Sequence, residues 1–244
     1  MVLNIHRKNS AIVMTSRIRL ARNLAHTRFS NAASCGELAE VFEKCADALS
    51  KTGKFKGGRL VKMSEISDFG KSMLVEERHA TRELAGATEN AGVYISKDGA
   101  ASAMINEEDH LRIQAVAKGQ RLNALWRTVN SIDDAVEERL EYAFSPNFGY
   151  LTACPTNVGT GMRASVMLHL PALSLGGQIE KIVRGLNQLG MVVRGANGEG
   201  SDSYGAFFQL SNQQTLGISE EEIIAKIAKF TDKLVEFETN ARLK

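Results

Sequence analysis

The stretch at residues 92–105, GVYISKDGAASAMI, consists of two short β-type runs on either side of Lys97-Asp98-Gly99. An Asp-Gly pair between such runs is a strong signal for a β-hairpin. The second run ends directly before three consecutive acids, Glu107, Glu108 and Asp109. We therefore expect an antiparallel hairpin whose second strand delivers a group of carboxylates to its end.

Working outward from this hairpin, the hydrophobic pattern predicts strands and helices in an irregular order, with no βαβ rhythm. Capping-box pairs, Ser34 with Glu37 and Ser219 with Glu222, mark the starts of two of the helices. Strands are expected at residues 12–20, 59–63, 92–96, 100–105, 111–116, 150–153, 163–170, 191–194 and 206–210, and helices at 34–49, 67–84, 120–143, 178–189 and from 219 onward. This mixture predicts an α+β fold with a largely antiparallel β-sheet flanked by helices.

The composition is that of a globular enzyme. The 244 residues carry 30 basic and 28 acidic side chains, a formal charge of +2, which gives no indication of nucleic-acid binding. The sequence has no apolar run long enough to cross a membrane and no secretory signal. Its three cysteines, Cys35, Cys45 and Cys154, follow no pairing pattern, as is typical of the reducing cytoplasm. Cys45 lies on the apolar face of an expected helix, so we interpret it as a core residue.

Five arginines lie at strand edges or beside loops that are rich in glycine or acid. A guanidinium stays charged near neutral pH and binds phosphate oxygens with two parallel hydrogen bonds. Any one of these arginines could be an ordinary surface charge, but five at such positions favour an anion site. The sequence has no P-loop and no Gly-rich loop of the protein-kinase type. The five are Arg17, Arg19, Arg112, Arg163 and Arg194.

The acids allow two interpretations. A run such as Glu107-Glu108-Asp109 is often a solvated turn, but it can also hold a cationic substrate and remove its proton. A free guanidinium has a pKa above about 12, so its nitrogen becomes nucleophilic only as a proton leaves. Glu199, in a later glycine-rich loop, is a candidate partner of these acids.

Cys154 begins a loop that is rich in Gly and Thr and ends at Arg163. Its thiol could orient a guanidinium as a thiolate, act as a covalent nucleophile, or be an inert buried group. No Cys or His spacing in the sequence indicates a zinc site.

Together these segments resemble the guanidino (phosphagen) kinase family, and within it most closely the catalytic domain of the bacterial protein-arginine kinases. The matching motifs occur in the family's order over nearly the whole chain. They are residues 15–24 (TSRIRLARNL), 76–79 (EERH), 106–112 (NEEDHLR), 154–165 (CPTNVGTGMRAS) and 194–199 (RGANGE), with further support from 166–173 and 208–213. Mild departures are Thr15 and Ala153, where serine is common in the family.

The resemblance implies a glutamine synthetase-like catalytic fold and MgATP-dependent transfer of the γ-phosphoryl group to a guanidinium nitrogen. The acceptor is expected to be arginine side chains in proteins. Free arginine or another small guanidino compound is the first alternative, and a catalytically silent nucleotide- or phosphoarginine-binding module is the second. Magnesium is expected to be held by phosphates and water, without a protein ligand set.

The resemblance also assigns roles to residues. Glu108 is the expected base, Glu107 and Glu199 assist it or bind the substrate, and Cys154 orients the guanidinium. The residues expected at the nucleotide are Ser16, Arg17, Arg19, His79, Arg112, Arg163, Ala164, Ser165, Val166, Met167, Arg194, Gly195 and Gly198.

Residues 1–244 are expected to form a single catalytic domain, without the N-terminal helical domain of creatine and arginine kinases. The C-terminal phosphoarginine-binding domain of the bacterial enzymes is also expected to be absent. The resemblance leaves open whether the protein forms a homodimer. It implies no partner among nucleic acids or membranes.

Overall fold

The computed structural model describes residues 11–87, 89–195 and 204–243. Its strands are β1 (Val13–Arg22), β2 (Arg59–Lys62), β3 (Gly92–Ile95), β4 (Ala101–Ile105), β5 (Leu111–Lys118), β6 (Phe144–Ser145), β7 (Gly149–Tyr150), β8 (Met162–His169), β9 (Met191–Gly195) and β10 (Phe207–Asn212). Its α-helices are α2 (Cys35–Ser50), α3 (Asp68–Glu76), α4 (Arg82–Ala85), α5 (Leu122–Glu137), α6 (Pro171–Leu175), α7 (Ile179–Gln188) and α8 (Glu220–Arg242).

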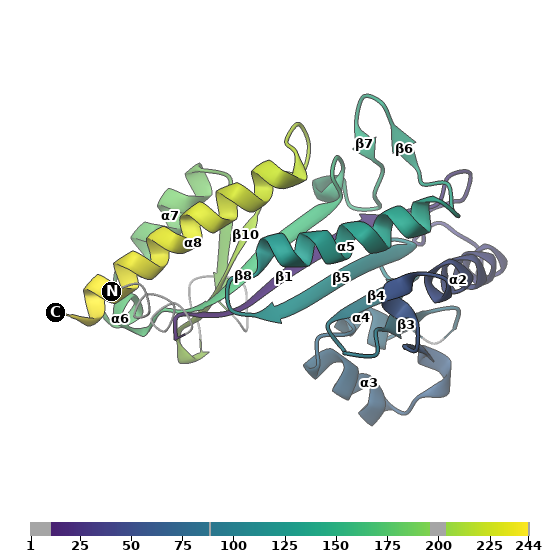
Figure 1. Ribbon diagram of the computed structural model, residues 1–244, viewed down its shortest axis with the longest axis horizontal. Helices are drawn as coiled ribbons and strands as arrows, with labels where there is room; N and C mark the ends of the chain where they lie inside the picture. Colours follow the sequence, from purple (N-terminus) through teal and green to yellow (C-terminus); the bar gives the residue numbers. More distant parts are fainter. Residues whose placement is uncertain (1–10, 88, 196–203, 244) are drawn as a thin grey trace. The chain divides into compact units, whose positions relative to one another are not determined.

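The strands form one eight-stranded sheet in the order β2-β3-β4-β5-β1-β8-β10-β9, and β6 and β7 form a separate hairpin (Figure 1). The pairings β2–β3, β3–β4, β4–β5, β8–β10 and β10–β9 are all antiparallel. The expected α+β fold with a largely antiparallel sheet is therefore confirmed.

The described chain divides into two compact units. The first contains residues 11–18, 116–125, 163–195 and 204–243; the second contains residues 19–87, 89–115 and 126–162. Strands β1, β5 and β8 and helix α5 contribute residues to both units.

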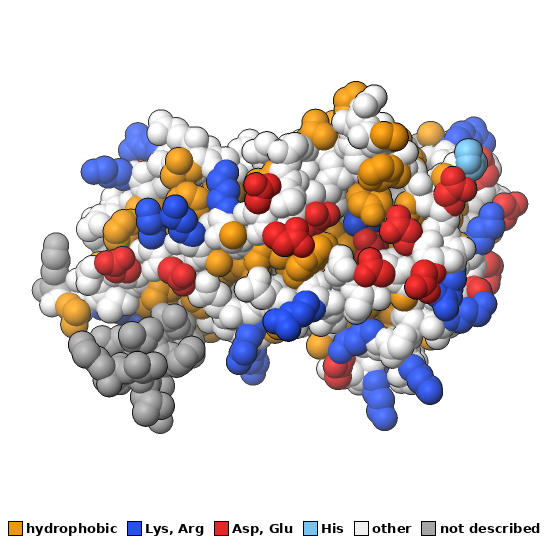
Figure 2. Space-filling view, turned by 45° about the horizontal axis from the view of Figure 1, so that its top comes forward, with side chains coloured by type: hydrophobic (Ala, Val, Ile, Leu, Met, Phe, Trp, Pro, Cys, Tyr) orange, Lys and Arg blue, Asp and Glu red, His pale blue; other side chains and the backbone are white. Residues whose placement is uncertain are grey.

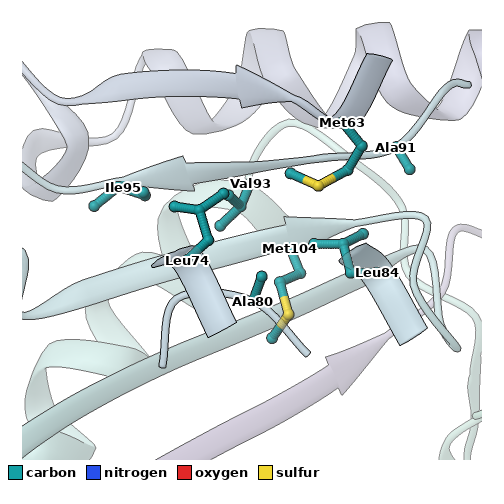
Figure 3. Packing of buried hydrophobic residues seen from close by; sticks show 8 residues of the cluster. All are labelled: Met63, Leu74, Ala80, Leu84, Ala91, Val93, Ile95 and Met104. Atoms are coloured by element: carbon teal, nitrogen blue, oxygen red, sulfur yellow. The ribbon is translucent and has the colours of Figure 1, made fainter. Parts of the chain in front are cut away.

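The second unit is built around the hairpin that the Asp-Gly pair predicts. In it β3 pairs with β4, so that Val93 lies opposite Met104. Helices α3 and α4 cover this face, and Leu74 and Leu84 point from them toward the sheet (Figure 3). Burial of one leucine side chain contributes roughly 1.5–3 kcal/mol, so this layer holds the two short helices in place.

The expected helix at residues 67–84 is wrong, because the chain reverses in its middle. Arg78 adopts a left-handed conformation with φ of 64°, and the backbone N–H groups of His79 and Ala80 both donate to the carbonyl oxygen of Leu74. A second helix then starts at Thr81, whose side chain caps it by accepting from Leu84 N. Thr81 is the local sequence signal for the start of this second helix, but the hydrophobic pattern of residues 67–84 runs on through it.

The helix expected at residues 120–143 ends earlier than predicted, at Glu137. The backbone N–H of Ala143 instead donates to the carbonyl oxygen of Asn23, and the chain enters the hairpin β6–β7. The strand expected at 150–153 is likewise reduced to β7, since residues 151–153 form no strand.

Both predicted capping boxes are confirmed. The side chains of Ser34 and Ser219 accept from the N–H groups of Glu37 and Glu222, whose carboxylates bond back to the cap backbone. On α2, Cys45 is fully buried, and burial raises the pKa of its thiol to about 12. Cys45 is therefore an unreactive core residue, as the sequence predicts.

In the first unit, α8 packs against β10 and α7 against β9. The short helix α6, which the sequence pattern did not reveal, packs against α8. Its first turn is held by Glu238 of α8, whose buried carboxylate accepts from the N–H groups of Ala172 and Leu173.

On the surface, basic and acidic side chains are interspersed, and hydrophobic side chains gather over the hairpin β6–β7 (Figure 2). Phe144 and Phe148 of this hairpin are each more than half exposed. None of the helices in the described part of the chain is long and apolar enough to cross a membrane.

Candidate active site

The acidic segment forms the tight turn between β4 and β5. Asn106 begins it in a left-handed conformation with φ of 53°, which asparagine tolerates better than most residues. Its backbone N–H donates to the carbonyl oxygen of His110, and its side-chain amide donates to the carbonyl oxygens of Leu38 and Asn90. The turn is thus anchored to the rest of the second unit, and the two acids that follow Asn106 have defined positions.

Glu107 is a buried carboxylate with a full set of donors. Its Oε1 accepts from Arg112 Nη1 at 2.8 Å and from Thr81 Oγ1 at 2.8 Å, and its Oε2 accepts from the N–H of Glu108 at 2.7 Å. Its side chain is 2% exposed. Three donors leave about one of the four acceptor sites of this carboxylate for a substrate.

Glu108 occupies a different environment. One of its oxygens, Oε2, accepts from Arg112 Nη2 at 2.7 Å, and its side chain is 45% exposed. Glu108 can therefore meet a substrate, whereas Glu107 is enclosed. That Glu108 is the base stays a prediction.

Arg112, on β5, bonds to both acids, and its side chain is 11% exposed. The sequence interpretation gives it a phosphate to hold. In the structure its guanidinium bonds to both carboxylates and holds them in a fixed relation to each other, and its contact with phosphate stays a prediction.

The loop that follows β7 presents Cys154. The thiol is half-buried, its Sγ lies 3.0 Å from Thr156 Oγ1, and Cys154 is the N-cap of a short 3₁₀-helix, Pro155–Asn157. Thr152 Oγ1 donates to the carbonyl oxygen of Cys154 at 2.8 Å. These bonds fix the sulfur within its loop while leaving it accessible, so the reading of Cys154 as an inert buried thiol is not favoured.

The third acid of the run, Asp109, is fully buried and bonds to two other segments, at Asn23 and Ala153. The next residue, His110, is also fully buried, and burial lowers the pKa of its ring. Its Nδ1 accepts from the N–H of Leu24. Sequence analysis did not single out Asn23 or His110, whose only signal is their place inside the motifs at 15–24 and 106–112.

His79 lies on the connection between α3 and α4. Its carbonyl oxygen accepts from Ser102 Oγ at 3.4 Å, and the neighbouring carbonyl of Arg78 accepts from Gln114 Nε2 at 2.6 Å. Burial is the main cause that lowers the pKa of His79, so its ring is neutral near pH 7. The neutral ring of His79 can accept or donate a hydrogen bond, but it adds no charge to its surroundings.

In the first unit, strand alternation and register determine which side chains share a face of the sheet. On β8, Arg163, Ser165 and Met167 point to one side, while Ala164 and Val166 are fully buried on the other. Any contact that Ala164 or Val166 makes with a nucleotide would therefore involve the backbone.

Arg194 belongs to the same face as Met167. Gln209 of β10 pairs with Met167 of β8 on one side and with Arg194 of β9 on the other. Arg194 is exposed and Arg163 is half-buried. Gly195, which closes β9, is buried.

On β1, Arg17 and Arg19 are both half-buried and share one side of the strand, as alternation predicts. Ser16 is fully buried on the other side, where its Oγ donates to the carbonyl oxygen of Gly119 and accepts from the N–H of Arg121. Ser16 therefore anchors β1, and its hydroxyl is already bonded. Gly198 and Glu199 lie outside the described residues.

One arginine of the 15–24 motif is purely structural. Arg22 is 1% exposed, and its Nη2 lies 2.6 Å from Asp133 Oδ2 on α5. Its Nη1 donates to the carbonyl oxygens of Ala21 and Thr160, and its guanidinium lies 3.5 Å from the ring centroid of Tyr150. This ion pair was not predicted, because its partners are more than a hundred residues apart.

Among the described residues, no three His, Cys, Asp or Glu side chains are placed to hold a metal ion. The chemistry that this part of the chain offers is a base, a thiol and several guanidinium groups. It suits a cationic acceptor together with a polyanionic donor.

Comparison with known proteins places these residues in a family. A family model described as ATP:guanido phosphotransferase, C-terminal catalytic domain, matches residues 26–241. A protein-arginine kinase from Halothermothrix orenii is 46% identical over 231 residues, which are 95% of this chain and 66% of that protein. The protein-arginine kinase of Bacillus subtilis is 45% identical over 240 residues, covering 96% of this chain and 64% of that protein. The chain thus spans slightly less than two thirds of the length of these relatives.

The chain is also similar in structure to solved kinase structures. The duplicated taurocyamine kinase from Schistosoma mansoni, with bound transition state analog components, has a TM-score of 0.85 and 26% identity, and covers 95% of this chain and 34% of that one. Lombricine kinase has a TM-score of 0.83 and 26% identity, and covers 96% of this chain and 68% of that one.

Proposed function

Because the chain belongs to the ATP:guanido phosphotransferase family, we propose that it transfers the γ-phosphoryl group of ATP to arginine side chains of proteins. The observation that supports this acceptor most directly is the identity of 44–46% with relatives named protein-arginine kinase, over nearly the whole chain. The arrangement of Glu107, Glu108, Arg112 and Cys154 supports the chemistry.

In the proposed reaction Glu108 removes a proton from the acceptor guanidinium. As the N–P bond forms, the N–H proton passes to the Glu108 carboxylate, the bond from the γ-phosphorus to the bridging oxygen breaks, and ADP leaves. A positioned carboxylate of this kind accelerates a reaction typically by roughly 10²–10⁴-fold. The half exposure of Glu108 allows the approach of a guanidinium, and its bond to Arg112 fixes its direction.

Glu107 and Arg112 act on the acceptor through Glu108. Because Glu107 and Glu108 share one guanidinium, Arg112 keeps two carboxylates close together that would otherwise repel each other. Thr81 completes the arrangement by tying Glu107 to the start of α4.

Cys154 is proposed to orient the acceptor through its sulfur, without a covalent intermediate. Phosphoryl transfer depends mainly on positioning and on neutralising charge, so an orienting group is sufficient. The hydroxyl of Thr156, at 3.0 Å from the sulfur, can donate to a thiolate and stabilise it.

The nucleotide is proposed to bind through arginines. Arg163 and Arg194 share a face of the first unit with Ser165 and Met167, and Arg17 and Arg19 share a side of β1. Forked guanidinium groups match phosphate oxygens and neutralise the charge of the leaving ADP. Gly198 and Glu199 remain part of the proposal from sequence alone.

Magnesium is proposed to enter with ATP. The described residues offer no cluster of protein ligands for a metal ion. When bound, the ion would be held by phosphate oxygens and water, and would screen the charge of the phosphates.

A second candidate acceptor is a small guanidino compound. The similarity to structures named taurocyamine kinase and lombricine kinase supports it, but their identity of 26% is far below that of the protein-arginine kinases. Both candidates use the same base and thiol, so the acceptor must be determined by experiment.

The test is incubation of the protein with γ-labelled MgATP and one of three acceptors. These are an unfolded arginine-containing protein, the same protein with its arginines replaced by lysine, and free arginine. Acid-labile, base-stable label on the arginine protein alone supports the proposal. Label on free arginine alone supports the small-molecule acceptor, and label on neither refutes both.

A further inference from the structure

The third acid of the turn, Asp109, does not belong to the cluster of Glu107, Glu108 and Arg112. It is 0% exposed, and its Oδ1 accepts two hydrogen bonds, from Asn23 Nδ2 and from the N–H of Ala153, both at 2.7 Å. These bonds join three segments of the second unit: the end of β1, the acid turn and the loop of Cys154.

We propose that Asp109 is a positioning residue that fixes the Cys154 thiol relative to the Glu108 carboxylate; this inference rests on the proposed function. Asp109 is the residue after Glu108, and Ala153 is the residue before Cys154. The bond from Ala153 to Asp109 therefore joins the two motifs one residue away from each reacting side chain. Loss of this bond would let the two groups that meet the guanidinium move apart.

Asn23 braces the same junction with both ends of its amide. Its Nδ2 donates to Asp109 and, at 3.1 Å, to the carbonyl oxygen of Leu151, while its Oδ1 accepts from the N–H of His110 at 2.9 Å. Asn23 thus holds the acid turn and the cysteine loop at once. This arrangement limits movement of Asp109 away from Ala153.

A purely structural role explains the carboxylate of Asp109 poorly. Its second oxygen, Oδ2, is buried and has no hydrogen-bond partner among the described residues. Burying an unsatisfied oxygen destabilises the folded protein. What Oδ1 of Asp109 adds is two short hydrogen bonds, both of 2.7 Å, that hold the cysteine loop and the end of β1 against the acid turn.

The ring of His110, the neighbour of Asp109, bonds to other groups. Burial is the largest influence on the pKa of His110 and lowers it, and the opposing influence of Asp109 is smaller. The ring is bonded to the N–H of Leu24 and lies 2.9 Å from the carbonyl oxygen of Arg28. It therefore serves to fix the turn.

The test compares Asp109→Ala and Asp109→Asn with a matched control, Glu238→Ala. Glu238 of α8 is also a fully buried carboxylate. It accepts from two backbone N–H groups and from Arg242 Nε, and it lies in the first unit, where it holds α6. Three quantities are measured: kcat and KM with MgATP and the arginine-containing protein, the melting temperature, and the rate of Cys154 alkylation by iodoacetamide, followed by peptide mass spectrometry.

We expect Asp109→Ala to lower kcat by about 10²-fold, since a misplacement of about 1 Å at a reacting group has an effect of this size. KM for ATP should stay within about twofold, and Asp109→Asn, which keeps Oδ1, should recover about a tenth of the wild-type kcat. Alkylation of Cys154 should become faster in Asp109→Ala. The control should lose stability and keep both kcat and the alkylation rate.

Wild-type kcat and an unchanged alkylation rate in Asp109→Ala would overturn the inference, as would an equal loss of kcat in Glu238→Ala. If the wild type phosphorylates no acceptor, the proposed function fails, and the alkylation rate of Cys154 still decides whether Asp109 holds the loop. If Asp109→Ala does not fold, Asp109→Asn and Asn23→Ser replace it, and wild-type kinetics in both would overturn the inference.

Discussion

Replacing Glu107 and Glu108 by glutamine, one at a time, distinguishes the roles of these two neighbouring glutamates. Glu107 is enclosed and accepts from three donors, whereas Glu108 is half exposed and accepts from Arg112. We expect Glu107→Gln to act mainly on folding stability. Glu108→Gln should act mainly on catalysis.

The size of the stability loss follows from counting donors. The Gln amide has a single oxygen, which is best placed where Oε1 accepts from Arg112 and Thr81. Its NH₂ group then faces the N–H of Glu108, where two donors meet; because this hydrogen bond is exposed, water can replace the lost acceptor at little cost. The bond to Arg112 also loses the charge of its acceptor. A hydrogen bond to a charged group contributes roughly 1.5–3 kcal/mol, and its loss lowers the melting temperature of a protein of this size by roughly 3–12 °C.

The assay is thermal unfolding followed by circular dichroism for the wild type, Glu107→Gln and Glu108→Gln. For Glu108→Gln the loss should stay below about 1 kcal/mol, because an exposed ion pair contributes little. In the kinase assay the same variant should lose roughly 10²–10⁴-fold in kcat.

A fall in melting temperature of less than about 2 °C for Glu107→Gln would refute the structural role of Glu107. Loss of its hydrogen bonds should lower the melting temperature by more than that. Full activity of Glu108→Gln would refute its role as base.

Three further predictions test separate parts of the molecule. Cys154→Ala should keep its melting temperature within about 2 °C and lose at least about tenfold in kcat; unchanged kinetics would leave the thiol without a role in orienting the acceptor. Glu37→Gln removes a carboxylate whose pKa is lowered to about 2, first by its hydrogen bond with Arg28 and then by the cap of α2. The carboxylate therefore stabilises the fold above pH 4.5 and loses this effect as the pH falls toward 2, so urea titrations should show the variant less stable at pH 7 and equal to the wild type near pH 2. Leu84→Ala, in the core under α4, should cost roughly 2–5 kcal/mol in urea unfolding, whereas Leu175→Ala, at a leucine 91% exposed, should change stability by less than about 0.5 kcal/mol.

Local signals in the sequence were sufficient for much of the fold. The Asp-Gly turn predicts the hairpin of β3 and β4, and the capping boxes at Ser34 and Ser219 predict the starts of α2 and α8. These signals work because both partners of each interaction lie within a few residues of each other. The same periodicity that predicts helices hid the reversal at Arg78, since a left-handed residue leaves no mark on the hydrophobic pattern.

By itself the sequence determined which chemical groups are available: two adjacent glutamates, a thiol in a tight loop and a set of arginines. Only the tertiary structure decided that Glu107 is enclosed and Glu108 accessible, because Thr81, which closes over Glu107, comes from the start of another helix. The junction of Asp109 with Ala153 is likewise invisible in the sequence. Forty-four residues separate the two, and burial and hydrogen bonding at such a separation depend on how the whole second unit packs.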